Sequence, residues 1–216
     1  MVYYEAVIGS RCYDLELPDS DIDVVMVSED LFLNSHHCNV HTIQIPKKCF
    51  IDRVTYKDRY PYSHQYLFPS KILSSGPISD LILEVREDLI LANLPTVWDV
   101  HFHQATVLSM HTDVYYNAFP KRIAYSTLLF DLLAKYADGS PFSKAIKPDT
   151  IFKKSLLSMR CREMPVKDAI YINNEAKHRA IQASEFYNRK VNRKFIDEVR
   201  AEMNSIMFST AHDTRR

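Results

Sequence analysis

The sequence predicts an α+β protein, with short strands in its first part and helices in its second. Three runs within residues 1–46 are rich in β-branched or aromatic side chains and are bounded by glycine, proline or polar residues. Beyond about residue 118, apolar residues instead recur three and four positions apart, which is the spacing of one helix face. We therefore expect a sheet-containing core over residues 1–115 and a helical domain over residues 116–216.

The predicted strands are residues 2–8, 22–27 and 40–45. The first stops at Gly9, and the third alternates polar and apolar residues until a proline ends it. The second is apolar except for Asp23. Burying a carboxylate within such a run is costly unless it is paired or bound to a cation, so Asp23 is a candidate functional residue.

The spacing of apolar residues also predicts three helices. Residues 78–92 have helical spacing, and the clearest helix starts at Pro120 and stops before Gly139. Its apolar face comprises Tyr125, Leu128, Leu129, Leu132, Leu133 and Tyr136. One long helix is expected near the C-terminus, with a stripe formed by Ala180, Ala183, Tyr187, Val191, Phe195, Val199 and Met203. Residues 52–77 lack a clear period and predict a loop-rich connection or insertion.

Composition narrows the classes of protein. A chain of 216 residues that is 46% hydrophobic can bury a core of its own. Lys plus Arg and Asp plus Glu both total 27, so no overall field favours nucleic acid or an anionic membrane. No signal peptide or long apolar span is evident, and the four cysteines form no Cys-x-x-Cys pair. We expect a cytoplasmic protein with free thiols and no membrane partner.

The chemistry is concentrated near the N-terminus. Gly9 and Ser10 follow the first predicted strand, whereas Asp21 and Asp23 open the second. Glycine lets the backbone approach a phosphate closely, and a serine hydroxyl can donate a hydrogen bond to a phosphate oxygen. Residues two apart on a strand face the same side, so the two carboxylates can converge on one metal site. Together these residues predict binding of a triphosphate and a divalent metal.

This arrangement resembles the DNA polymerase beta superfamily of nucleotidyltransferases over roughly residues 5–28. Tyr13 and the run from Pro18 to Asp23 look closest to the subset associated with RNA repair pathways. The resemblance implies a nucleotidyltransferase core with a short mixed sheet and a cleft to the helical domain that holds ATP or another NTP. It also implies transfer of an NMP to an acceptor hydroxyl, with RNA or tRNA as the expected acceptor.

The resemblance also implies roles for individual residues. Gly9, Ser10 and Arg11 would hold the β- and γ-phosphates, and Asp21 and Asp23 would bind Mg²⁺ or Mn²⁺. Because helical domains of this superfamily often lend a basic residue to the nucleotide, Lys121 is a further candidate for triphosphate contact.

Two positions depart from the family pattern. Asp14 stands where the subset usually has glycine, and the strand that should carry a third carboxylate reads Cys38-Asn39-Val40-His41-Thr42-Ile43. His41 or Asn39 can occupy that place, with His41 acting as a base or as a softer metal ligand. Alternatively, Asp52 folds back into the site, or catalysis has been lost while nucleotide binding remains.

Two other functions remain open on the sequence. One is a catalytically silent nucleotide- or RNA-binding module, and the other is a regulatory or toxin-type protein that uses the same fold on a protein or tRNA partner. An RNA acceptor could bind basic residues of the predicted C-terminal helix, namely Lys177, Arg179, Arg189, Lys190, Arg193, Lys194 and Arg200. We favour the simpler interpretation that these basic residues lie on a solvated helix face and are balanced by acidic residues.

Two histidine groups complete the candidates. His36, His37, Cys38 and His41 are residue types that bind zinc, but no partner pair follows, so a polar loop leading into a strand is favoured. His101 and His103 would share a face if they lay on a strand. Paired histidines of this kind are more often surface residues than metal ligands.

Overall fold

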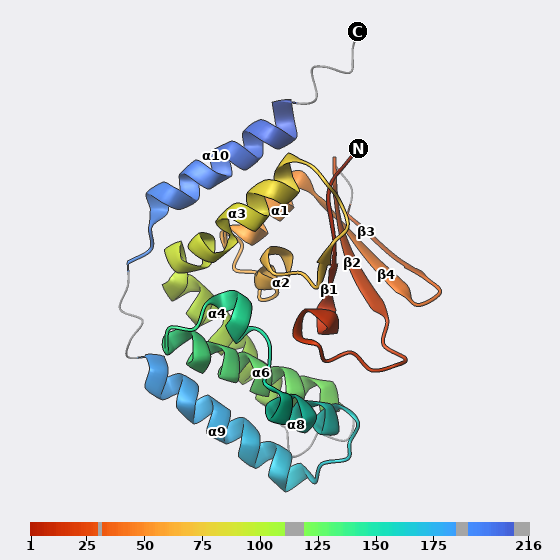
Figure 1. Cartoon of the computed structure of the whole chain (residues 1–216), viewed down its shortest axis with the longest axis vertical. Helices are drawn as coiled ribbons and strands as arrows, with labels where there is room; N and C mark the ends of the chain where they lie inside the picture. The colour runs from red at the N-terminus through yellow and green to blue at the C-terminus, as the bar shows by residue number, and fades with distance from the viewer. Residues whose placement is uncertain (30–31, 111–118, 185–189, 210–216) are drawn as a thin grey trace. The chain divides into compact units, whose positions relative to one another are not determined.

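The computed structural model describes residues 1–29, 32–110, 119–184 and 190–209 and has an α+β architecture (Figure 1). The chain divides into two compact units, residues 1–93 with 190–216 and residues 94–189. The division expected after residue 115 differs from this partition at two places. Helix α4 (Leu94–Ser109) belongs to the second unit, and helix α10 (Arg193–Ser209) returns to the first.

Within the described residues, the first unit contains a five-stranded mixed sheet in the order β3-β4-β2-β1-β5. The predicted strands are confirmed within one residue as β1 (Val2–Ile8), β2 (Ile22–Ser28) and β4 (Val40–Pro46). β1 is antiparallel to β2, which is parallel to β4. The edge strands are β3 (Leu33–His37), antiparallel to β4, and β5 (Lys71–Ile72), antiparallel to β1.

The polar loop expected at His36 and His37 is wrong, because both residues lie in β3. This strand and β4 form a hairpin in which Cys38 takes the left-handed conformation, with φ 54°. β3 is exposed along its whole length, so it has no apolar alternation from which a strand could be predicted. Its pairing with β4, a contact made in the folded chain, establishes it as a strand.

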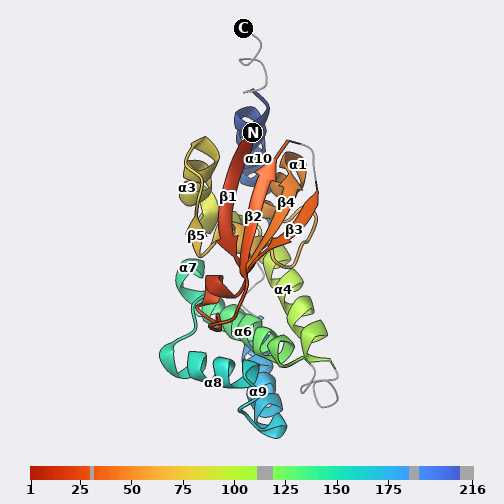
Figure 2. The ribbon, with the colours of Figure 1, turned by 90° about the vertical axis from the view of Figure 1, so that its right-hand side faces the viewer.

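Helices α1 (Lys47–Val54), α2 (Ser63–Leu67) and α3 (Pro77–Ala92) lie on one face of the sheet (Figure 1), and Figure 2 shows the strands in front of α1. α3 confirms the helix predicted over residues 78–92. The loop-rich insertion expected over residues 52–77 is wrong in part, since this segment includes α2 and β5. All five residues of α2 are buried, and the Tyr4 hydroxyl of β1 donates to the Tyr66 carbonyl at 2.8 Å. A helix this short shows no periodicity in the sequence.

The prediction of a single long C-terminal helix is also wrong. The chain instead forms α9 (Val166–Ser184) in the second unit and α10 in the first. Asn192 marks the start of α10. Its Oδ1 accepts a hydrogen bond from the Phe195 amide at 3.3 Å, as an N-cap residue does. Its own amide donates to the last carbonyl of α3 at 2.8 Å. This capping and long-range pairing decide where the helix begins.

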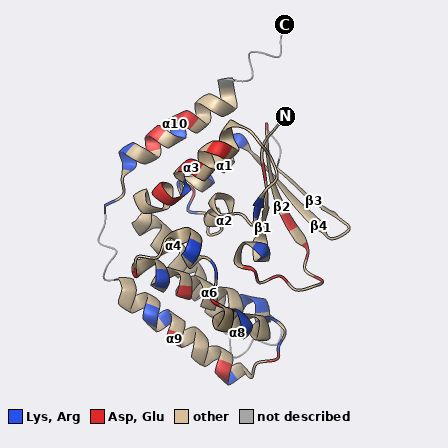
Figure 3. Cartoon of the chain, in the orientation of Figure 1, with Lys and Arg blue, Asp and Glu red and all other residues tan. Residues whose placement is uncertain are grey.

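The basic residues expected on one helix are therefore divided between two. Lys177 and Arg179 lie on α9, whereas α10 carries Arg193, Lys194 and Arg200. Ion pairs join Arg179 to Asp131, Lys194 to Glu198 and Arg200 to Asp52. Figure 3 shows acidic residues among the basic ones on α10. Arg189 and Tyr187, which the sequence places on the same helix, lie outside the described residues.

The second unit is built around α6 (Pro120–Ala137), which confirms the clearest predicted helix. It packs against α4, α7 (Phe142–Ala145), α8 (Thr150–Arg160) and α9. Unlike a helix with one apolar face, it is buried without a break from Ile123 to Ala134. Polar residues in this stretch are hydrogen-bonded to neighbouring helices, and Asn173 of α9 donates to Ser126 at 2.8 Å and to Thr127 at 3.0 Å.

Among the residues that the structure describes, no helix combines the length and apolar composition needed to cross a bilayer. The cysteines Cys12, Cys38, Cys49 and Cys161 are all free thiols.

We expect the stability of the second unit to depend on pH because of His101. It lies on α4, where burial lowers its pKa from 6.5 to about 3, while His103 is exposed. Between these pH values the unfolded chain binds a proton that the folded chain excludes. The free energy of unfolding should therefore fall as the pH drops below 6.5, by up to about 1.4 kcal/mol per pH unit.

Replacing His101 with glutamine should remove this slope, whereas the matched change His103→Gln should retain it. Denaturant titrations at pH 7.5 and pH 5 test this expectation. Trp98, the single tryptophan, also lies on α4 and reports unfolding of this unit by fluorescence. An equal pH dependence in wild type and His101→Gln would contradict the assignment.

Candidate functional site

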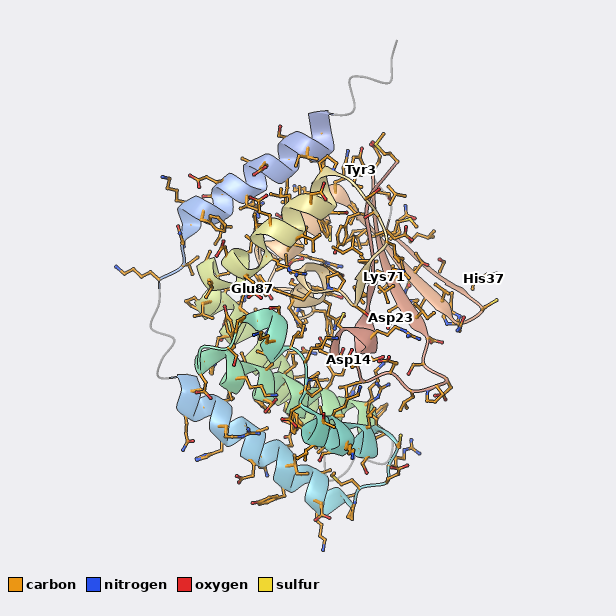
Figure 4. All side chains as sticks on the ribbon, viewed as in Figure 1. Tyr3, Asp14, Asp23, His37, Lys71 and Glu87 are labelled. Atoms are coloured by element: carbon orange, nitrogen blue, oxygen red, sulfur yellow. The ribbon has the colours of Figure 1, made fainter. Side chains whose placement is uncertain are left out.

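Three strands place the predicted site residues at one end of the sheet. Asp23, the second residue of β2, lies opposite Ile8 at the end of β1 and opposite His41 near the start of β4. Gly9 follows Ile8 directly and opens a short 3-10 helix, η1 (Gly9–Tyr13). Figure 4 shows Asp23 and Asp14 at this end of the sheet and Tyr3 towards the other end.

Gly9 and Asp23 are packed so closely that a side chain at position 9 would force one of them to shift. Gly9 has φ +76°, and a Cβ added to it would lie 2.2 Å from Asp23 Oδ2. An ordinary side chain here would therefore be strained by the left-handed conformation and would have to displace the Asp23 carboxylate. The absence of a Cβ is what lets the Asp23 carboxylate lie against the backbone of the turn.

The turn also explains the departure at Asp14. This residue has φ 56°, in the left-handed region, and caps the end of η1. Glycine takes this conformation without strain, and aspartate is among the other residues that adopt it most readily. The turn thus has a conformation that glycine would also adopt, with aspartate occupying it.

Each aspartate faces a histidine. Asp23 Oδ1 lies 2.9 Å from His41 Nδ1, and both side chains are about one-quarter exposed. Asp21 Oδ2 lies 3.4 Å from His36 Nε2, nearer to solvent. The second ring nitrogen of His41 contacts Asn34 Oδ1 on β3. The aspartates and histidines that the sequence singled out therefore form two neighbouring Asp–His pairs.

His41, Asn39 and Asp52, the candidates for completing the site, have different neighbours. His41 is the direct neighbour of Asp23 on β4, while the backbone carbonyl of Asn39 accepts a hydrogen bond from Ile22 at 2.7 Å. Asp52 is on α1, which starts at the opposite end of β4, and its Oδ1 lies 2.6 Å from Arg200 Nη2. The structure brings His41 to Asp23 and places Asp52 in an ion pair with α10.

The remaining predicted residues differ in their surroundings. Ser10 is buried in η1, and the buried Nε of Arg11 has no hydrogen-bond partner among the described residues. Buried polar atoms usually have partners, so this nitrogen is one that an anion could satisfy. Lys121 is exposed at the start of α6, in the second unit, so its contact with a triphosphate held by the first unit stays a prediction.

Two neighbouring residues of α2 contact the turn and were missed from the sequence. Gly9 donates its backbone N–H to Gln65 Oε1 at 3.0 Å, and Gln65 Nε2 donates to the Tyr13 hydroxyl at 2.9 Å. That hydroxyl also hydrogen-bonds to His64 Nε2. No spacing rule links residues 64 and 65 to residues 9 and 13, so only the folded chain could identify these contacts.

Each of the two carboxylates has one oxygen available to a cation such as Mg²⁺. Within the described ranges, Asp21 Oδ1 and Asp23 Oδ2 make no hydrogen bond, while the other oxygen of each faces a histidine. Mg²⁺ often binds one or two carboxylates together with substrate phosphates and water. No group of three or more His, Cys, Asp or Glu side chains that could hold a metal occurs among these residues. The two carboxylates fit an ion that the substrate phosphates help to bind.

Comparisons with known proteins add no assignment to this geometry. No protein-family model, no curated protein and no solved structure matched the chain.

Proposed function

We propose that this chain is a metal-dependent nucleotidyltransferase of the DNA polymerase beta type, which moves an NMP from an NTP to an acceptor hydroxyl. The observation that carries the proposal is the contact between Gly9 and Asp23. A glycine with φ +76° leaves room for the carboxylate directly beside the turn. A nucleotidyltransferase needs this juxtaposition, because the same metal must touch both the carboxylates and the triphosphate.

The proposed roles follow from the positions of the side chains. Asp21 and Asp23 would hold Mg²⁺ or Mn²⁺ through the oxygens that do not face the histidines. The bound metal would neutralise charge on the phosphates during transfer. Ser10 and Arg11 would hold the phosphates beside the turn, and the unpartnered Nε of Arg11 supports a role in binding an anion.

His41 is best suited to orienting Asp23. Both of its ring nitrogens are engaged by oxygen atoms, on Asp23 and Asn34. A general base needs a ring nitrogen directed at the hydroxyl that it deprotonates. A histidine that holds a metal-binding carboxylate in place is a common arrangement around metal sites. We therefore favour the orienting role over the base.

The acceptor is proposed to be RNA, as the resemblance implies. The basic residues expected on one C-terminal helix do not support this choice. They are divided between α9 and α10, and several of them are ion-paired.

Incubation with NTPs labelled at the α-phosphate tests the function. The protein would be supplied with Mg²⁺ or Mn²⁺ and, in parallel, with tRNA, total RNA or a protein fraction. Label that moves with RNA supports the proposal, whereas label on protein favours the toxin-type alternative. NTP binding without transfer would identify a silent nucleotide-binding module. Absence of both binding and transfer would refute the proposal.

A further inference from the structure

Helix α2 has an unusual composition for a buried element. Three of its five residues, Ser63, His64 and Gln65, are polar, and none is more than 3% exposed. Burying polar side chains costs free energy unless they are hydrogen-bonded, so polar residues here need a compensating contact. For His64 and Gln65 that contact is the turn that carries Gly9.

The hydrogen bonds hold both ends of η1. The Gly9 backbone N–H can only donate, so the amide oxygen of Gln65 must be the acceptor. The amide nitrogen of Gln65 is then directed to the Tyr13 hydroxyl, which also contacts His64. One side chain therefore spans the turn from its first residue to its last, with Ser10 and Arg11 between the two contacts.

α2 is attached to β1 and to α1 independently of Gln65. The Tyr4 hydroxyl donates to the Tyr66 carbonyl at 2.8 Å, and Arg53 Nη1 donates to the Tyr66 hydroxyl at 2.7 Å. Loss of the Gln65 side chain should therefore release the turn while α2 stays in place. Because of this separation, a positioning role can be distinguished from general stability.

We propose that Gln65 is a positioning residue, which fixes the turn from Gly9 to Tyr13 against Asp23 so that the phosphate contacts are already in place when an NTP binds. This inference rests on the proposed function for its effect on catalysis. It also implies that the Gly9 N–H does not bind the phosphates. Because that group donates to Gln65, contacts between the turn and the phosphates would come from Ser10 and Arg11.

The test compares Gln65→Leu with Gln65→Glu and with the control Ser63→Ala. Leucine loses both contacts, whereas glutamate can still accept from the Gly9 N–H. Ser63 is equally buried in α2, and its hydroxyl has no hydrogen-bond partner among the described residues. We expect Gln65→Leu to raise the KM for NTP on the order of tenfold to a hundredfold, since small misplacements of contacts have such effects.

Gln65→Glu should recover part of this loss, and Ser63→Ala should leave KM unchanged. A purely structural role would lower the fraction of active protein and hence kcat, but not raise KM. An unchanged KM in Gln65→Leu would overturn the positioning role.

Amide hydrogen exchange at Gly9 tests the same inference without turnover. The Gly9 amide should be protected in wild type and in Ser63→Ala, and should exchange faster in Gln65→Leu. Rapid exchange in wild type would overturn the inference. If wild type binds and transfers no NTP, the proposed function fails by itself, and exchange still decides whether Gln65 holds the turn.

Discussion

Gly9→Ala is expected to destabilise the first unit by about 2–5 kcal/mol, the sum of a left-handed alanine and an overpacked contact. The added Cβ would lie 2.2 Å from Asp23 Oδ2 and 3.0 Å from its Cγ. Either the turn or the carboxylate must move, so NTP transfer should be lost along with stability. The free energy of unfolding is obtained from amide hydrogen exchange, which reports each unit separately.

Gly139→Ala is the matched control. Gly139 has φ +87°, close to that of Gly9, but an added Cβ would meet no atom within 4 Å. Gly139→Ala should lower the free energy of unfolding by only about 1–2 kcal/mol, which is the cost of a left-handed alanine alone. In the double variant Gly9→Ala with Asp23→Ala, removing the carboxylate should recover part of the stability. Equal losses in the two single glycine variants would contradict the close packing of Gly9 on Asp23.

Asp23→Asn is expected to lower NTP transfer about a thousandfold, since the metal contributes several kcal/mol to the transition state. The amide is nearly the same size as the carboxylate and can still hydrogen-bond to His41, so the fold should persist. The amide lacks the negative charge that holds a divalent cation. The measurement is the turnover rate at saturating NTP and Mg²⁺. Circular dichroism confirms that the variant is folded.

Asp19→Asn provides the control for a lost charge in the same region. Asp19 is exposed in the loop before β2 and forms no ion pair with a described residue. Its variant should retain wild-type turnover. If turnover survives both Asp21→Asn and Asp23→Asn, the metal assignment is wrong.

The fold could be predicted where a local pattern was strong. The apolar runs of β1, β2 and β4 and the helical spacing of α3 and α6 were each visible in the sequence. The edge strand β3 and the short helix α2 had no such pattern, because one is exposed and the other is only five residues long. β3 is stabilised by pairing with the next strand, β4, whereas α2 is stabilised by partners distant in the chain.

The candidate site divides in the same way. By itself, the sequence determined that Gly9 ends a strand and that Asp21 and Asp23 open another, because these features depend on neighbours along the chain. Only the tertiary structure decided that His41 lies beside Asp23, that Asp52 pairs with Arg200, and that Gln65 holds the turn. Those contacts join residues 18 to 148 positions apart, and such separations leave no periodic signal.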